Sequence, residues 1–239
     1  MKIKLLIFIP VYNEEGNIEI IVKRIFKKFK KNVDILFIDD NSPDDTQKNI
    51  LKLQLKYKNI ILIKRKKKLG VGSAHKVGIN WAYKKKYNLL VTMDCDGTHD
   101  PFYIKKIISN LQKNKSDITI TNRFLEKNSL KDWSFWRKFL TQLRHLFVKL
   151  FLNIRYDSSG AFRCYDLKKI KLRDILRAKN DGYSFFWESI FILHKLDYKI
   201  TEIPIKLPGR LMGKSKMKFF DVLIALSYLL RVSIRNFKK

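Results

Sequence analysis

Apolar segments of strand length alternate with amphipathic segments of helical periodicity along the first half of this chain. The apolar segments lie at residues 3–9, 34–38, 60–63, 89–93 and 117–121, and the helical ones at 18–29, 44–57, 74–85 and 101–112. This alternation predicts βαβ units with right-handed crossovers and parallel strands. The strands lack polar–apolar alternation, as expected when helices cover both faces of a sheet. The prediction is an α/β fold with a mostly parallel, Rossmann-like sheet flanked by helices.

An amphipathic helix is predicted at residues 133–154, in the less regular second half. One face comprises Trp136, Phe139, Leu140, Leu143, Leu146, Phe147, Leu150, Phe151 and Ile154. The other face comprises Arg137, Lys138, Thr141, Gln142, Arg144, His145 and Lys149. Such a helix packs on the protein's own core or lies at a membrane interface.

The C-terminal segment 219–234 has the same amphipathic character. Its apolar side carries Val222, Leu223, Leu226, Leu229 and Leu230, opposite Ser227, Arg231, Arg235 and Lys238. The segment includes charged residues and is shorter than the ~20 residues that span a bilayer. It is therefore expected to lie on a membrane or to pack on a partner without spanning.

A formal net charge of +29 points to a polyanionic partner. Nucleic acid, an anionic membrane surface and phosphorylated substrates all meet that requirement. The basic residues are mostly Lys, so codon bias in an AT-rich genome is an alternative source of the charge. The two cysteines, Cys95 and Cys164, provide no disulfide framework and suit a reducing compartment.

Two carboxylates follow the apolar segment that ends at Met93. Asp94 and Asp96 are two residues apart, so in an extended chain they point to the same side. Converging carboxylates repel each other unless a cation lies between them, and Mg²⁺ and Mn²⁺ prefer oxygen ligands. The motif predicts a divalent metal site at the end of a strand, although Asp-x-Asp in isolation is more often a solvated turn.

Polar residues also follow the first two predicted strands. They are Pro10, Tyr12, Asn13, Glu14, Asp39 and Asp40. Because the carboxyl ends of parallel strands share one edge of a sheet, these residues are expected to meet the metal motif there. Gly70-x-Gly72 is not a complete dinucleotide fingerprint, so a Rossmann dehydrogenase is rejected.

Several short motifs together resemble those of the family 2 inverting glycosyltransferases. They are Pro-Val-Tyr-Asn-Glu at 10–14, Ile-Asp-Asp-Asn-Ser-Pro at 38–43, Met-Asp-Cys-Asp at 93–96 and Asp-Ser-Ser-Gly-Ala-Phe-Arg at 157–163. The segments 182–188, 202–205 and 210–216 are similar to those of the polyprenyl-phosphate sugar synthases, the group of dolichol-phosphate mannosyltransferase. The resemblance extends over residues 3–218.

This resemblance implies a GT-A fold, a nucleotide-sugar donor (GDP-mannose or a UDP-hexose) and Mg²⁺ or Mn²⁺ as cofactor. It assigns the metal to Asp94 and Asp96, and the donor to Pro10, Tyr12, Glu14, Asp39, Asp40, Asp94 and Arg123. It assigns the acceptor phosphate to Arg123, Arg137, Arg210, Ser215 and Lys216. The implied catalytic residues are Asp94, Asp96 and Arg210. Relatives often carry a Gln at the position of Thr98, so Thr98, His99 or a water is expected to replace it at the metal.

The resemblance also implies where the protein works. Many relatives carry C-terminal transmembrane helices, whereas this chain has one short amphipathic segment there. The expected organisation is a glycosyltransferase domain at 1–218 followed by a membrane- or partner-associating helix at 219–239. The expected location is cytoplasmic, peripheral on the cytoplasmic face of a membrane, with a membrane protein as a further candidate partner.

The implied reaction transfers a hexose, with mannose favoured, to a polyprenyl or dolichyl phosphate at the membrane surface. A phosphate with a second pKa of ~6 is already anionic near neutral pH and needs no strong base. One alternative is a hydroxyl acceptor in cell-surface glycan synthesis, which requires a base such as Asp96, Asp157 or Glu188. Two further interpretations of Glu188 stay open, namely that it hydrogen-bonds substrate or that it fixes Arg163.

The alternative from another class is a basic nucleic-acid-binding protein. Such a protein would gather Arg and stacking aromatic residues on one surface. Here the basic residues are dispersed and mostly Lys, and the carboxylates would repel phosphates without a metal. No nucleic-acid partner is therefore expected.

Overall fold

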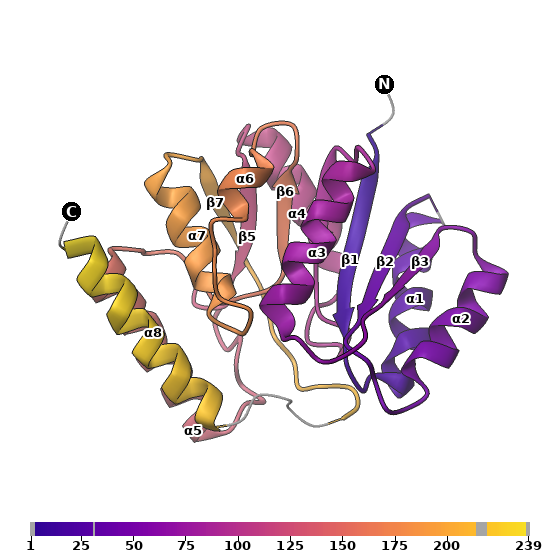
Figure 1. The fold of residues 1–239 in the computed structure, drawn as a ribbon, viewed down its shortest axis with the longest axis horizontal. Helices are drawn as coiled ribbons and strands as arrows, with labels where there is room; N and C mark the ends of the chain where they lie inside the picture. The colour runs from indigo at the N-terminus through magenta and orange to yellow at the C-terminus, as the bar shows by residue number, and fades with distance from the viewer. Residues whose placement is uncertain (1–2, 31, 214–218, 238–239) are drawn as a thin grey trace.

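A seven-stranded sheet forms the centre of the protein (Figure 1). The computed structural model describes residues 3–30, 32–213 and 219–237. In sheet order the strands are β3 (Ile60–Lys64), β2 (Asp34–Asp39), β1 (Leu5–Val11), β4 (Leu89–Thr92), β6 (Arg163–Asp166), β5 (Ile118–Asn122) and β7 (Ile200–Pro204). The helices are α1 (Glu15–Phe29), α2 (Thr46–Lys56), α3 (Val71–Lys84), α4 (Phe102–Lys113), α5 (Phe135–Leu152), α6 (Leu172–Ile175), α7 (Phe185–Lys195) and α8 (Phe219–Phe237). The predicted α/β fold is confirmed.

Helices cover both faces of the sheet, which explains why strands β1 to β4 are mostly apolar. Along β1, Leu6 and Phe8 pack with residues of α3 and α7, whereas Ile7 and Ile9 pack with residues of α1 and α4. Successive side chains of a strand point to opposite faces, so β1 contributes to both hydrophobic clusters. Each fully buried Ile or Phe side chain stabilises the fold by roughly 1.5–3 kcal/mol.

The order of the strands places a ligand crevice between β1 and β4. β2 and β3 lie on one side of β1, and β4 pairs in parallel on its other side. In open α/β sheets, ligands bind at such a switch point, outside the carboxyl ends of the strands. The residues that follow Val11 and Thr92 therefore meet at this crevice.

β6 departs from the parallel order. It runs antiparallel to both β4 and β5, and β7 resumes the parallel direction beside β5. β6 was not predicted from the sequence, because its four residues begin with Arg163 and end with Asp166 and so form no apolar run. Its antiparallel direction pairs Arg163 with Thr92, which brings the preceding segment 157–162 to the carboxyl end of β4.

α5 forms where a helix was predicted, but its polar stripe turns inward. Its inward stripe comprises Arg137, Thr141, Arg144, Val148 and Leu152, which are buried or line a cavity. Its exposed apolar residues are Phe135, Trp136, Phe139, Leu146 and Leu150, with Trp136 exposed to 69%. Leu140, Leu143 and Phe147 of the predicted apolar face line the same cavity, so the inward side draws on both predicted faces and the predicted division is only partly right.

α8 lies alongside α5 (Figure 1). Its Leu229 is buried, and the Tyr228 ring lies 5.6 Å from that of Trp187 on α7. Leu230, predicted to share a side with Leu229, is exposed together with Ile224 and Ile234. Within the described parts of the chain, no helix has both the length and the apolar character needed to cross a bilayer.

Candidate active site

The loop after β4 holds its two carboxylates through hydrogen bonds among its own residues. The Asp94 backbone N–H donates to His99 Nδ1 at 2.8 Å. The backbone N–H and the hydroxyl of Thr98 donate to Asp96 Oδ1 at 3.0 and 2.6 Å. His99 Nδ1 and the Thr98 hydroxyl thus orient the carboxylate loop. The expectation that Thr98, His99 or a water replaces the Gln of relatives at the metal stays a prediction.

The environments of Asp94 and Asp96 differ. Burial raises the pKa of Asp94 above its usual value, and this outweighs the nearby His99 and Arg210. Burial acts in the same direction on Asp96, but Arg210 and the hydrogen bonds from Thr98 lower its pKa overall. Arg210 Nη1 lies 2.8 Å from Asp96 Oδ2. Asp96 is therefore compensated by Arg210, whereas Asp94 brings a poorly compensated carboxylate to the site.

The two carboxylates fit the demands of a hard divalent cation. The Asp94 side chain is 39% exposed, and one of its carboxylate oxygens lies 3.6 Å from His99 Nδ1. Among the described residues no group of three or more His, Cys, Asp or Glu side chains could enclose a metal. Mg²⁺ commonly binds through one or two carboxylates and takes its other ligands from substrate phosphates and water. Asp94 and Asp96 match that type of site.

A cavity of about 400 Å³ opens at the switch point between β1 and β4. Its lining includes five of the seven residues predicted for the donor, namely Pro10, Tyr12, Glu14, Asp40 and Asp94, together with the predicted metal ligand Asp96. Arg123, also predicted for the donor, does not line it. The lining also includes Lys68, whose ammonium lies 3.9 Å from the centre of the Tyr12 ring, a contact that the sequence did not indicate. We call this space the first cavity.

Asp39 and Asp40 have different places at the first cavity. Asp40 lines it, forms an ion pair with Arg65 and accepts hydrogen bonds from the backbone N–H groups of Leu69 and Gly70. Asp39 does not line the cavity and accepts hydrogen bonds from Ser42 and from Gln47 Nε2. The structure therefore places Asp39 as a brace of the loop after β2, away from the predicted donor contact.

A second cavity, of about 480 Å³, extends from the carboxylates toward α5 and α8. Its cationic end contains Arg123, Arg137, Arg144 and Arg210, and its apolar end contains Leu140, Leu143, Phe147, Phe186, Trp187, Leu226 and Leu229. Asp94, Asp96 and Arg210 line both cavities. The two spaces therefore meet at the carboxylates and at Arg210.

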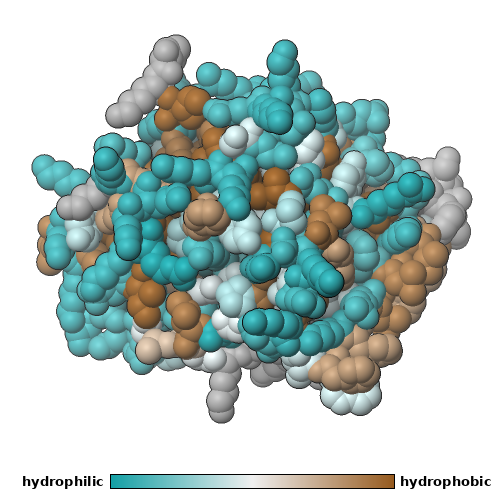
Figure 2. Space-filling view, turned by 180° about the vertical axis from the view of Figure 1, so that it is seen from behind, coloured by the Kyte–Doolittle hydropathy of each residue, from teal (hydrophilic) through white to brown (hydrophobic). Residues whose placement is uncertain are grey.

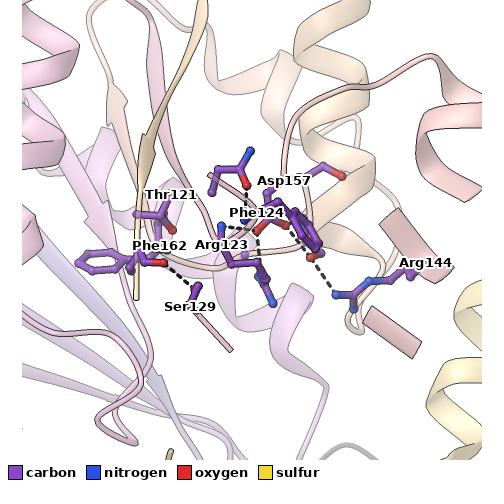
Figure 3. A network of polar contacts seen from close by, with 12 residues as sticks. Thr121, Arg123, Phe124, Ser129, Arg144, Asp157 and Phe162 are labelled. Carbon is purple, nitrogen blue, oxygen red and sulfur yellow. Dashed lines mark hydrogen bonds and ion pairs between the residues drawn. The ribbon is translucent and has the colours of Figure 1, made fainter. Parts of the chain in front are cut away.

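Arg123 is held at the second cavity by Asp157 (Figure 3). Arg123 Nε donates to Asp157 Oδ2 at 2.6 Å, and Arg144 reaches the other oxygen through Ser159, with distances of 2.8 and 2.9 Å. Gly160 leaves room for this arrangement, because a Cβ there would lie 3.2 Å from Arg123 Nη2. Burial alone would raise the pKa of Asp157, but Arg123 and the hydrogen bonds hold it below its usual value. Asp157 is thus an ionised counterion of Arg123.

Glu188 fixes the wall of the first cavity. It accepts hydrogen bonds from the backbone N–H groups of Lys179 and Asn180 at 3.0 and 2.9 Å, and from the Tyr228 hydroxyl at 2.7 Å. Arg163, its expected partner, instead donates to backbone oxygens of Ser158, Gly160 and Phe186 and to Ser189. The interpretation that Glu188 fixes Arg163 is therefore wrong.

The segment that carries Arg210 crosses over the carboxylate loop. The Leu211 N–H donates to the Asp96 carbonyl oxygen at 2.9 Å. Gly97 has a φ of 83°, and a Cβ at this position would collide with the Leu211 side chain. These contacts hold Arg210 beside Asp96. The predicted residues Ser215 and Lys216 lie outside the described residues.

Sequence reasoning missed Arg144, Thr141 and Trp133, all of which line the second cavity. Arg144 and Thr141 had been placed on the polar face of the helix, with no role in the site. Their spacing with Arg137, at i, i+4 and i+7, puts all three on one stripe of a helix and was the signal available. Trp133 lies just before the helix and had been counted only as part of it.

The model of glycosyl transferase family 2 matches residues 6–171. The chain belongs to this family. It is therefore a glycosyltransferase, as its motifs predicted. The polyprenol monophosphomannose synthase of Mycolicibacterium smegmatis is 28% identical over 214 residues, covering 89% of this chain and 80% of that protein. The undecaprenyl-phosphate mannosyltransferase of Micrococcus luteus is 26% identical over 215 residues, covering 90% and 87%.

Solved structures confirm the predicted GT-A fold of this family 2 glycosyltransferase. Glucosyl-3-phosphoglycerate synthase from Mycobacterium tuberculosis, in complex with Mn²⁺, UDP-glucose and phosphoglyceric acid, superposes with a TM-score of 0.67 at 14% identity, covering 96% of this chain and 79% of that one. The same synthase with Mg²⁺ and UDP gives a TM-score of 0.65 at 15% identity, covering 95% and 78%.

Proposed function

We propose that this glycosyltransferase transfers mannose from a nucleotide sugar to a polyprenyl monophosphate at a membrane surface. The observation that carries the proposal is the second cavity, which joins a cationic end at the carboxylates to an apolar end between α5, α7 and α8. A lipid phosphate has the same polarity, with an anionic head on an apolar chain. The names of the two curated relatives support mannose as the sugar and a polyprenyl phosphate as the acceptor.

The nucleotide sugar would occupy the first cavity, with its diphosphate beside Asp94 and Asp96. These two carboxylates would hold Mg²⁺ or Mn²⁺, which neutralises the charge that develops on the diphosphate leaving group. Arg210 lines both cavities and would contact the donor and acceptor phosphates together. Fixed cations of this kind stabilise a charged transition state without reorganisation during the reaction.

In the proposed reaction an oxygen of the acceptor phosphate attacks the anomeric carbon. A bond from this oxygen to the anomeric carbon forms as the bond from that carbon to the diphosphate oxygen breaks, and the electron pair leaves with the diphosphate. The acceptor is already ionised near neutral pH because its second pKa is ~6, so no side chain has to remove a proton. Arg123, Arg137 and Arg210 would orient the attacking phosphate.

The hydroxyl-acceptor alternative requires a general base, and the three candidates are already engaged. Asp96 is bonded to Arg210 and Thr98. Asp157 is ion-paired with Arg123, which lowers its pKa. Glu188 lines neither cavity and accepts three hydrogen bonds. These contacts favour a phosphate acceptor over a hydroxyl.

Attachment to the membrane surface is part of the proposal. The helices that flank the apolar end of the second cavity also carry exposed apolar residues, namely Phe135, Trp136, Phe139, Leu146 and Leu150 on α5 and Ile224, Leu230 and Ile234 on α8. A hydrophobic strip lies at this side of the molecule, at the lower right of Figure 2. Peripheral binding to the cytoplasmic face through these helices would let a lipid phosphate enter from the bilayer. A membrane protein is the alternative occupant of the strip.

The proposal is tested with purified protein, Mn²⁺ or Mg²⁺, and labelled GDP-mannose, GDP-glucose, UDP-glucose or UDP-galactose. Each donor is offered polyprenyl phosphate, the corresponding polyprenol or a soluble sugar. The expected result is label transfer from GDP-mannose to the phosphate alone, giving a product that releases mannose in mild acid. Transfer to the polyprenol or to the soluble sugar in preference to the phosphate would refute it.

A further inference from the structure

Three buried N–H groups of the second cavity lack a hydrogen-bond acceptor among the described residues. They are Trp133 Nε1, Arg144 Nε and Arg210 Nε, and all three residues line the second cavity. Buried polar groups in folded proteins are nearly always paired, and an unpaired one costs free energy. The shared location of these donors indicates a ligand that brings several acceptor oxygens to one place.

We propose that Arg144 and Trp133 bind the acceptor phosphate directly, as donors that complete the site formed by Arg123, Arg137 and Arg210. This inference rests on the proposed function and names two further residues for it. Both donors are restricted to the second cavity, because neither Arg144 nor Trp133 lines the first. They therefore act on the acceptor and leave the nucleotide sugar alone.

The surroundings of Arg144 leave its charge available for an anion. Its Nη2 donates to the neutral Ser159 hydroxyl at 2.8 Å, which holds the guanidinium in place. The carboxylate beyond Ser159 belongs to Asp157, which is already ion-paired with Arg123. Burial, reinforced by Arg123, lowers the pKa of Arg144 to about 10. An anionic oxygen beside the guanidinium would offset this unfavourable burial of charge.

Trp133 sits among the other cations of the site. The Arg137 guanidinium lies 3.5 Å from the centre of the Trp133 ring, and that of Arg123 lies 5.8 Å from it. Cation–π contacts of this kind hold guanidinium groups against an indole face. The indole N–H can only donate a hydrogen bond, so an acceptor oxygen of a bound phosphate would satisfy it in this cationic cavity.

The experiment compares Arg144→Gln, Arg144→Lys and Trp133→Phe with the wild-type enzyme, using polyprenyl phosphate and GDP-mannose. Arg155→Gln is the matched control, since Arg155 is exposed and lines neither cavity. Arg144→Gln is expected to raise the KM for lipid phosphate about 10- to 100-fold, the usual effect of a lost hydrogen bond to a charged group. The KM for GDP-mannose should stay within twofold, and Arg144→Lys should recover part of the loss.

Trp133→Phe keeps the aromatic face and removes only the N–H, so it should raise the KM for lipid phosphate without changing the melting temperature. Inorganic phosphate should raise the melting temperature of the wild type more than that of Arg144→Gln or Trp133→Phe. If Arg144→Gln fails to fold, the lipid-phosphate KM values of Trp133→Phe and Arg144→Lys test the assignment instead. Unchanged lipid-phosphate KM in the folded variants, or equal increases in both KM values, would overturn the assignment. A wild-type enzyme that does not use lipid phosphate would instead refute the proposed function.

Discussion

Arg210 Nη1 lies 2.8 Å from Asp96 Oδ2, at the point where the two cavities meet. The pair joins a residue assigned to the acceptor with one assigned to the metal. The Arg210 Nε remains unpaired within the described structure, so part of the guanidinium is free to contact a substrate. A substitution of either residue should therefore alter the binding of both the donor and the acceptor.

Arg210→Ala is expected to lower kcat about 100-fold or more, the usual effect of removing one donor that stabilises developing charge. Because Arg210 lines both cavities, the KM values for donor and acceptor should both rise, and Arg210→Lys should retain more activity than Arg210→Ala. Steady-state kinetics with each substrate varied in turn measures this. An increase confined to the lipid-phosphate KM would place Arg210 in the second cavity alone.

Asp94→Asn should abolish metal-dependent binding of the nucleotide while leaving the fold intact. The Asp94 carboxylate is partly exposed, and among the described residues no Lys or Arg side chain forms an ion pair with it, so its loss breaks no buried Lys or Arg ion pair there. Calorimetric titration of Mn²⁺ and GDP into the variant should show affinity reduced at least tenfold, with an unchanged melting temperature. Asp100→Asn, in the same loop but paired with Arg24, is the control. Full turnover of the wild type in a metal chelator would refute the metal site.

Trp136→Glu combined with Leu150→Glu should weaken binding to anionic lipid vesicles. Both side chains are exposed, to 69% and 63%, and a carboxylate there would oppose insertion into the interface. Vesicle sedimentation measures the effect, and Leu55→Glu, at a position that is 93% exposed on α2, is the matched control. Wild-type binding should also weaken in high salt, because salt screens the attraction of basic residues to anionic lipid.

Alkaline carbonate should release the protein from membranes if α5 and α8 only lie on the surface. Retention after that wash would indicate a spanning segment. Equal losses of vesicle binding in the Leu55 control and in the α5 variant would indicate that charge, and not the α5 surface, controls attachment.

Tyr228→Phe and Glu188→Gln should weaken donor binding from a distance. Glu188 joins α8 to residues 179–180, and Asn180 lines the first cavity. Loss of one hydrogen bond to a charged group costs about 1.5–3 kcal/mol, so the KM for nucleotide sugar should rise by at most about 10- to 100-fold. Tyr198→Phe is the matched control, because its hydroxyl donates to Asp174 at 2.8 Å and lines neither cavity. Unaltered donor KM in both variants would show that the loop is held by other contacts.

His75→Leu should make the protein less sensitive to acid. Burial lowers the pKa of His75 from 6.5 to about 3, so the folded state keeps it neutral while the unfolded state takes up a proton below pH 6.5. The free energy of unfolding therefore falls as pH decreases through this range, by at most about 1.4 kcal/mol per pH unit for one group. Denaturant unfolding between pH 7 and pH 4 should show a shallower decline in the variant. Equal slopes would show that the ring is protonated in the folded protein.

The sequence determined the features that depend on short-range pattern. Apolar runs alternating with helical periodicity were enough to predict the parallel part of the sheet, because side-chain period follows from local backbone geometry. The polar residues after Val11 and Thr92 were placed correctly at one edge, since the carboxyl ends of parallel strands coincide. Composition had no part in this, because net charge bears on partners and not on fold.

Tertiary structure alone decided which side of α5 faces inward. The helical pattern groups Arg137, Thr141 and Arg144 on one stripe, but only the antiparallel β6, the neighbouring α8 and the 157–162 segment create the cavity that this stripe lines. Tertiary contacts also pair Asp157 with Arg123 and Glu188 with Tyr228, residues that lie far apart in the sequence. The periodicity of a helix is local, so the sequence reveals which residues share a stripe. Whether that stripe can be buried depends on the free-energy cost of burying its guanidinium groups, and that cost depends on partners far away in the chain.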